Sequence, residues 1–355
     1  MPEYLGLPQF DHGSSPRLGI LLVNLGTPEA PTPAAVRRFL AEFLWDGRVI
    51  EAPRWLWWLV LHGGILRLRP RRSAHAYRQI WTPQGSPLMI HSSELAQRLQ
   101  QRLPDAIVAL GMTYGAPAIK SSLEELHRRG ARRLIVLPLY AQYSGTTTAS
   151  VFDRVTRALG RFRWLPELRF INQYHDDPAY IAAIAASARQ HWQTHERRHL
   201  LFSFHGIPRS YLLAGDPYHC QCLKTARLVS EQLGLQPDEW SVAFQSQVGR
   251  AEWLRPYTDQ WLLENAKSGH KRVSVICPGF ATDCLETLEE IAIRNCALFL
   301  ANGGEAYDYI PALNATDAHV AMLAGLIARH AQGWPTHESA DPAARERALQ
   351  LGAAR

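Results

Sequence analysis

The stretch "LLFSFHGIPRSYLLAGDPY", residues 200 to 218, decides how this chain of 355 residues is interpreted. The stretch starts inside an apolar run that begins at residue 199 and ends at His205. Gly206 and Pro208 then turn the chain. A short, continuously apolar run is typical of a strand in a parallel sheet that helices cover on both faces. Ligands bind beyond the carboxyl ends of such strands, so the imidazole of His205 is a candidate functional group.

Further apolar runs of this kind alternate with longer helical patterns. The expected strands are 18–24, 106–111, 133–140 and 168–174, then 199–205, 240–246 and 272–280. The expected helices include 92–103, 117–130, 178–195 and 284–304. Alternation of strand and helix predicts βαβ units and parallel sheets. Two sets of about four strands, in a chain too long for one small core, predict an α/β protein with two similar doubly wound domains.

The domain limits follow from where these patterns stop. We expect a first domain over residues 16–160, which includes a Trp- and Arg-rich lip over 53–80, and a second domain over 161–312. A helix over 313–332 is expected to pack back on the first domain. The end of the chain has no strand pattern and little apolar face, so residues 333–355 are predicted to be disordered.

Composition and charge limit the classes of function. The chain is 46% hydrophobic and 20% charged, with a formal net charge of +6, which suits an anionic substrate or a lipid surface. No basic run is interleaved with aromatic residues, so nucleic acid is not an expected partner. The longest apolar run, "WLWWLVL" (55–61), is too short to span a bilayer, and no secretory signal is apparent. Five scattered cysteines favour a reducing compartment, so we expect a cytoplasmic protein.

An acidic segment, "DCLETLEEI" (283–291), follows the last expected strand. On a helix, Glu286 and Glu290 share a face, and Asp283 lies three residues earlier on the same side. If that face is dry, at least one of these carboxyls should have a raised pKa. The alternative is a solvated acidic face at a helix N-terminus. His205 likewise has two interpretations, a core histidine or an imidazole that faces the acids to bind a metal or accept protons. No Cys/His quartet with zinc spacing is present.

Three other segments carry weaker signals. "LLVNLGTPE" (21–29) resembles the start of a nucleotide-binding unit but lacks the G-x-G-x-x-G fingerprint. The hydroxyl-rich turn "LYAQYSGTTTASVFD" (139–153) either cradles an anion at a helix N-terminus or simply caps the helix. The lip combines three Trp with Arg67, Arg69, Arg71 and Arg72, which fits buried packing, anionic lipid or a large flat apolar ligand.

Taken together, these segments resemble the ferrochelatase family, whose members insert ferrous iron into a porphyrin in haem synthesis. The resemblance extends from residue 18 to about residue 330. Its blocks, in order, are "NLGTPE", "GSPL" (85–88), "QYSGTTT", the stretch 200–218, "QSQVGRAEWLRPYTD" (245–259) and "DCLETLEEI". This order of blocks is far more specific than any one motif.

The resemblance implies two Rossmann-like domains with the porphyrin in a cleft between them. It implies that His205 is the essential imidazole and Glu286 the carboxylate that faces it, the two groups that meet the metal. Glu290 and Asp283 would continue an acidic path for protons or metal. The porphyrin pocket would be lined or bordered by Tyr114, Trp253, Ser246 and Gln247.

The chain departs from the family pattern at two positions. Thr113 stands where an Arg is common, which puts a propionate or metal-entry contact in doubt, and Cys284 stands where some members have His. Cys284 is interpreted as a small packed thiol rather than a soft ligand. Some members carry a [2Fe–2S] cluster, and Cys220 and Cys222 are close in sequence, with Cys277, Cys284 and Cys296 elsewhere. We expect no cluster and no required cofactor, because the tail after Cys296 has no further Cys.

The expected reaction is the insertion of Fe²⁺, a substrate, into protoporphyrin IX with release of two protons. Distortion of the ring exposes the pyrrole nitrogens, His205 accepts the protons, and Glu286 handles metal delivery or proton exit on the opposite face. Three points stay open: the face by which iron enters, whether the substrate is coproporphyrin instead, and whether the protein is a monomer or a homodimer. The rival interpretations are a haem carrier, a cobalt or nickel chelatase and a nucleotide-binding oxidoreductase. The lip predicts a peripheral contact with the inner face of an anionic membrane.

Overall fold

The computed structural model describes residues 4–7, 11, 14–249, 251–335 and 342–353. Its first sheet has the strand order β2-β1-β3-β4, and every neighbouring pair is parallel. The strands are β1 (Arg17–Asn24), β2 (Ile107–Met112), β3 (Ala131–Pro138) and β4 (Glu167–Phe170). All four were expected from their apolar runs, and the sheet confirms the parallel interpretation.

The second sheet repeats this arrangement with the order β6-β5-β7-β8, again parallel throughout. Its strands are β5 (His199–His205), β6 (Trp240–Gln245), β7 (Arg272–Ile276) and β8 (Ala306–Ile310). The last of these was not expected. Its sequence AYDYI contains a charged residue, and most of it is only half-buried because the strand lies at the sheet edge.

Helices cover both faces of the first sheet. Alternate residues of β1 point to opposite sides: Leu21 and Val23 join the apolar cluster under α5 and α6, whereas Ile20 and Leu22 join the cluster that contains α4 residues. The helices of this half are α1 (Pro33–Leu44), α2 (Arg54–Val60), η1 (Leu61–Ile65), α3 (Leu66–Ile80), α4 (Pro87–Arg102), α5 (Ile119–Arg128), η2 (Gly145–Ala149) and α6 (Ser150–Leu159).

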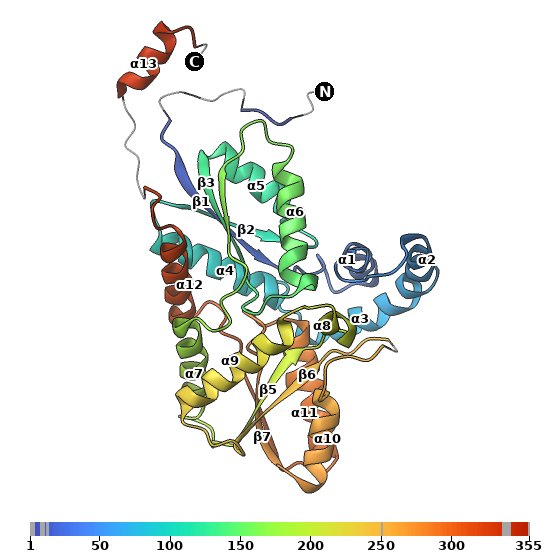
Figure 1. The fold of residues 1–355 in the computed structure, drawn as a ribbon. Helices are drawn as coiled ribbons and strands as arrows, with labels where there is room; N and C mark the ends of the chain where they lie inside the picture. Colours follow the sequence, from blue (N-terminus) through green and yellow to red (C-terminus); the bar gives the residue numbers. More distant parts are fainter. Residues whose placement is uncertain (1–3, 8–10, 12–13, 250, 336–341, 354–355) are drawn as a thin grey trace.

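The second sheet is covered in the same way, with α10, η3 and α11 on one face and α7 and α9 on the other (Figure 1). The helices of this half and of the chain end are α7 (Pro178–His191), α8 (Arg209–Leu213), α9 (Tyr218–Leu233), α10 (Thr258–Ser268), η3 (Glu286–Asn295), α11 (Cys296–Ala301), α12 (Asp317–His330) and α13 (Pro342–Gln350).

One apolar core joins the two halves. The largest cluster contains Ile20 of β1, Phe202 of β5, Ile184 of α7 and Leu323 of α12. In Figure 1, α7 and α12 follow one side of the molecule, from the second sheet up to the first. Helix α12 lies against both α4 and α7, so the chain after β8 returns to the first sheet.

Two expectations on domain limits differ from the structure. The expected boundary at residue 160 precedes β4, whose partner in the first sheet is β3. The tail was expected to be disordered, yet Pro342–Gln350 forms α13. Its sequence is rich in Ala, Arg, Glu and Leu, which favour helix, and it begins with a proline, which favours a helix start. Residues 336–341 and 354–355 of that expected tail lie outside the described residues.

Candidate active site

The two sheets meet at their carboxyl ends. Asn24, the last residue of β1, donates from its amide to the hydroxyls of Ser92 (3.0 Å) and of Thr282 (3.1 Å), which follows β7. The carbonyl of Asn24 accepts hydrogen bonds from the backbone N–H and the hydroxyl of Thr113. Thr113 therefore binds the end of β1 within the first sheet. The bond from Asn24 to Thr282 holds the ends of β1 and β7 together.

His205 lies at the carboxyl end of β5, as the sequence predicted. Its Nδ1 is 2.6 Å from the carbonyl oxygen of Gly206, and its ring centroid is 6.3 Å from that of Trp253 and 6.4 Å from that of Phe280. A carbonyl can only accept a hydrogen bond, so the neutral ring carries its proton on Nδ1. This leaves the lone pair of Nε2 for a proton or a metal ion.

Gly206 sets how close the neighbouring chain can come. A Cβ at this position would lie 3.1 Å from both the Gln245 carbonyl oxygen and Trp253 Cε3. The Gly206 N–H also donates to that carbonyl. Only a glycine lets β6 and Trp253 pack so tightly against the end of β5, so the turn after His205 places Trp253 beside the imidazole.

Glu290 is held by Ser246, which follows β6. The backbone N–H of Ser246 donates to Oε1 (2.9 Å) and its hydroxyl to Oε2 (2.5 Å), and Ser246 has a positive φ of 67°. Burial raises the pKa of Glu290, against the lowering effect of Ser246, Arg294 and His205. The raised pKa of Glu290 comes from burial and not from the expected repulsion among three acids on one stripe. The charge of His205 acts on the carboxyl of Glu290.

Glu286 begins the π-helix η3, and its backbone carbonyl accepts from the side chain of Gln245 (3.0 Å). Its charge acts on Arg69 of the lip and on the hydroxyls of Tyr77 and Tyr140. Burial raises the pKa of both tyrosines, and the charge of Glu286 raises it further. Sequence reasoning did not single out Tyr77 or Tyr140, because neither residue has a signal before the fold brings it near Glu286.

Asp283 does not share the face of Glu286 and Glu290. It precedes the helix, and its carboxylate accepts from Tyr309 (2.5 Å), Asn314 (2.7 Å) and Thr287 (2.9 Å). The expectation of three acids on one stripe assumed an α-helix, whereas η3 has the wider turn of a π-helix and starts only at Glu286. Asp283 is therefore 5% exposed and anchors the segment after β7 to β8 and the loop behind it.

The expected porphyrin-lining residues have different surroundings. Tyr114 is 1% exposed, and its hydroxyl bonds Asp46 (3.0 Å) and Ser150 (3.2 Å), so it belongs to the core of the lip helices. Trp253 is half-buried, and Gln247 is exposed and donates to the Tyr257 hydroxyl (3.3 Å). Trp253 therefore lies near His205, and Ser246 contacts Glu290, whereas Tyr114 packs within the core of the lip helices.

The hydroxyl-rich turn before α6 is already occupied by a carboxylate of the chain. Asp216 Oδ2 accepts from the Gly145 N–H (2.8 Å) and the Ser144 hydroxyl (2.9 Å), while its other oxygen accepts from the Tyr218 N–H. The turn therefore does bind an anion, as one interpretation of the sequence held, but that anion is the carboxylate of Asp216 in the second half of the chain. The contact ties "SGTTT" to "GDPY" across the two halves.

The cysteines are dispersed. Cys222, Cys277 and Cys284 are buried in three different apolar clusters, while Cys220 is exposed. Cys284 packs with Leu88 and Met112, and burial, reinforced by the charge of Glu286, raises the pKa of its thiol. Cys284 is therefore a packed thiol, as expected from the sequence.

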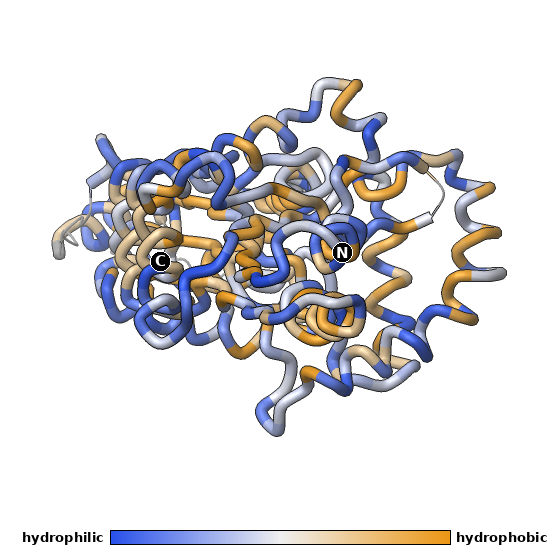
Figure 2. Tube along the Cα trace, turned by 90° about the horizontal axis from the view of Figure 1, so that it is seen from below, coloured by the Kyte–Doolittle hydropathy of each residue, from blue (hydrophilic) through white to orange (hydrophobic). Residues whose placement is uncertain are grey.

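The lip projects from the first sheet. Helices α2 and α3 lie to one side in Figure 1, and the same side of Figure 2 carries an outermost segment with many apolar residues. Trp55 is 71% exposed and Trp58 50%, whereas Trp57 turns inward and donates to the Leu44 carbonyl (2.6 Å). No helix among the described residues is long and apolar enough to cross a membrane.

Comparison with known proteins agrees with this arrangement. A family model described as Ferrochelatase matches residues 17–331. The chain is 53% identical to a ferrochelatase of Nitrosococcus oceani, over 99% of both chains, and 52% identical to a ferrochelatase of Thioalkalivibrio sulfidiphilus, over 98% of both. Among solved structures, SirB from Bacillus subtilis with Fe³⁺ has a TM-score of 0.55 at 11% identity, over 89% of this chain and 96% of that one. That likeness shows the fold, while the family model and the close relatives show that the chain belongs to the ferrochelatase family.

Proposed function

We propose that His205 and Glu286 carry out the chemistry of this chain from two sides of a bound porphyrin. The chain is a metal chelatase, a lyase that inserts Fe²⁺ into protoporphyrin IX in the last step of haem synthesis, as its family membership implies. The observation that carries the assignment of roles is the hydrogen bond from His205 Nδ1 to the Gly206 carbonyl. It fixes the tautomer that leaves Nε2 able to take a pyrrole proton.

Glu290 extends this site in the proposal. Its raised pKa lets it hold a proton at a higher pH than an exposed glutamate does, and the charge of His205 acts on it. A proton accepted by His205 can therefore pass to Glu290 and leave the buried region. The contacts of Asp283 favour an anchoring role instead of a place on this path.

Glu286 receives the metal in the same proposal. It lies within the electrostatic reach of Arg69 and of two tyrosine hydroxyls, so its surroundings combine a cation with neutral oxygen donors. A carboxylate oxygen is a suitable ligand for ferrous iron on its way to the ring. Neither a resident cofactor nor an iron–sulfur cluster has a role in this scheme.

The porphyrin is proposed to lie against Trp253, with Ser246 and Gln247 at its border. Trp253 offers an aromatic face beside His205, and apolar rings of this size favour flat ligands. Macrocycle contacts with this part of the site supply the binding free energy that distorts the ring and exposes its nitrogens.

The lip is proposed to touch an anionic membrane reversibly. Trp55, Trp58 and Leu59 are exposed on α2, and the exposed Arg67 and Arg71 follow on α3. Exposed Trp and Leu beside cations are typical of segments that lie in the lipid interface. The same lip would let an apolar porphyrin reach the site from the membrane, which favours protoporphyrin over coproporphyrin.

The activity is tested by anaerobic incubation with Fe²⁺ and each porphyrin in turn. Loss of the free-base absorbance spectrum with protoporphyrin, at a rate that saturates with both substrates, is the expected result. Faster turnover of coproporphyrin would overturn the substrate assignment. Insertion of Co²⁺ or Ni²⁺ but not Fe²⁺ would overturn the activity itself.

A further inference from the structure

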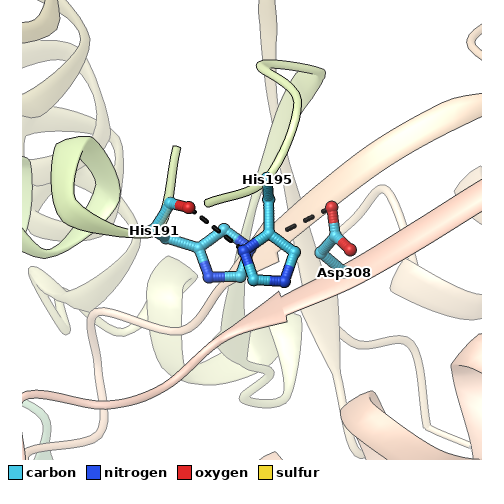
Figure 3. Close-up of side chains that lie close together, drawn as sticks. All are labelled: His191, His195 and Asp308. Atoms are coloured by element: carbon cyan, nitrogen blue, oxygen red, sulfur yellow. Dashed lines mark hydrogen bonds and ion pairs between the residues drawn. The ribbon is translucent and has the colours of Figure 1, made fainter. Parts of the chain in front are cut away.

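A second group of metal-binding side chains lies away from His205 and Glu286. His191 is the last residue of α7, His195 follows in the next turn, and Asp308 is the middle residue of β8. Candidate ligand atoms of these three residues all lie within 4.8 Å of one another. Figure 3 shows the two imidazoles stacked, with the carboxylate of Asp308 beside them. The group is at the edge of the second sheet, because β8 is its edge strand.

His195 packs directly on His191. Its ring stacks on that of His191 with centroids 4.0 Å apart and planes 6° apart. Its Nδ1 is 3.1 Å from the His191 carbonyl oxygen (Figure 3) and 3.0 Å from the Thr194 hydroxyl, which can donate or accept. In the tautomer in which Nδ1 donates to the His191 carbonyl, Nε2 of this exposed side chain has a free lone pair. Histidines that bind metals commonly donate their other N–H to a backbone carbonyl in this way.

His191 contributes a buried nitrogen. Its Nε2 is shielded from solvent and has no hydrogen-bond partner among the described residues. The same atom is 4.0 Å from Asp308 Oδ2. A buried polar atom without a partner is costly, and it marks a place where an ion or another group is needed. Burial, together with His195 and Arg198, lowers the pKa of His191, against the raising effect of Asp308.

The charges around the group are mixed. Arg198 Nη1 donates to Asp308 Oδ2 at 2.5 Å, and Glu196 in turn lies 3.9 Å from Arg198 and also pairs with Arg272. Asp308 Oδ1 accepts no hydrogen bond from the described residues, so one oxygen of the carboxylate is available. Carboxylate ligands are often held by a second hydrogen bond of this kind. Arg198 therefore fixes Asp308 while the group keeps two imidazole nitrogens and one carboxylate oxygen.

We propose that His191, His195 and Asp308 form a second metal site, separate from the insertion site, for a divalent transition metal such as Zn²⁺ or Co²⁺. Two imidazoles and one carboxylate are a donor set that these ions favour, with water in the remaining position. The bound ion would join the end of α7 to the edge strand β8. It would stabilise the second half of the chain without a part in iron insertion.

The test is a titration of chelator-treated protein with Co²⁺, followed by visible absorbance, and with Zn²⁺, followed by thermal unfolding. It uses the full chain with His205→Ala and Glu286→Gln, so that the insertion site contributes no binding. One bound equivalent is expected, with a rise in Tm of a few degrees at saturation. His195→Ala is expected to weaken this binding more than about 100-fold, because it removes a ligand rather than a supporting contact.

Two controls keep the outcome clear. His195 is exposed, so its replacement leaves the fold intact, and His75→Ala removes an exposed histidine from the lip without any expected effect. In the otherwise unchanged chain, His195→Ala should keep full iron insertion. Absence of Co²⁺ binding in the parent, or equal binding in the His195→Ala protein, would refute the second site and leave the proposed function untouched.

Discussion

At the residue scale, the tautomer of His205 is the feature with the largest expected effect. With Nδ1 bound to the Gly206 carbonyl, Nε2 is the one ring atom that can accept a proton. We predict that His205→Ala lowers the insertion rate by about 10²–10⁴-fold, the usual loss for a general base, while porphyrin binding persists. Insertion is measured by absorbance and binding by porphyrin fluorescence. A variant with more than about a tenth of the parent rate would contradict the role.

The two glutamates of η3 should differ in effect. Glu286 lies near the lip cation and the tyrosines, whereas Glu290 is held by Ser246 and is proposed to pass protons onward. We therefore expect Glu286→Gln to lower turnover more than Glu290→Gln at saturating iron and porphyrin. Equal turnover numbers in the two variants would show that the carboxylates are interchangeable.

The hydroxyl of Ser246 should set the pH dependence of the site. It donates to the charged form of Glu290 and so lowers a pKa that burial raises. Without this bond the charged form loses stabilisation, the pKa rises, and Glu290 stays protonated to a higher pH. We predict that Ser246→Ala moves the acidic limb of the rate profile upward by about one pH unit, the size expected for a lost hydrogen bond to a charge.

A matched comparison separates this effect from a change in folding. Glu290→Gln has no carboxyl to titrate, so its profile should lack that limb, and adding Ser246→Ala to it should not shift the remaining curve. If Ser246→Ala leaves the acidic limb in place, Glu290 is not the group that titrates there.

At the scale of the elements, the segment between β7 and η3 depends on Asp283. Three side chains and the Ala312 N–H donate to its carboxylate, and Asp283 is 5% exposed. An Asn side chain has a single acceptor oxygen, so Asp283→Asn leaves buried donors unpaired. We predict a loss of about 2–4 kcal/mol in the free energy of unfolding, measured by urea denaturation.

The control for this variant is Asp105→Asn, which changes an exposed aspartate in the loop before β2. Its midpoint should stay with the parent. If the Asp283→Asn protein unfolds at the same urea concentration as the control, the Asp283 carboxylate is not an anchor. That result would favour the place on a proton path that the sequence predicted for it.

The elements differ in how far the sequence alone predicts them. The strand over 199–205 was predicted at its true limits, because a continuous apolar run has one stable place inside a parallel sheet. Strand β8 was missed because Asp308 interrupts its apolar pattern. The π-helical turn of η3 gives no local signal, so the sequence placed Asp283 on a face that it does not occupy. Contacts that join distant segments, such as Asp216 with Ser144, have no local signal either.

At the scale of the whole molecule, the lip places exposed Trp and Arg side chains on one side of the protein (Figure 1). We expect the protein to sediment with anionic vesicles at low salt, less at high salt, and little with neutral vesicles, because cations near an anionic surface contribute about 1 kcal/mol each and salt screens them. Trp55→Ala with Trp58→Ala should weaken this binding, since both side chains are at least half exposed.

Trp164 offers the matched control, because it is 47% exposed on a loop outside the lip. Its replacement by Ala should leave sedimentation unchanged. Failure of the parent protein to bind anionic vesicles at low salt would mean that the lip serves only the porphyrin or the core.

The bond between Asn24 and Thr282 has a consequence for how the protein is made. It joins residues 258 positions apart, so the ribosome must add that many residues after Asn24 before the two ends of the site can meet. At about 5–20 residues per second this takes about 13–50 s. During that interval the nascent first sheet lacks α12, whose apolar residues belong to the same core cluster as Ile20 and Leu22. Newly made chains are therefore inactive and expose apolar surface until synthesis is nearly complete, which makes them natural clients for chaperones.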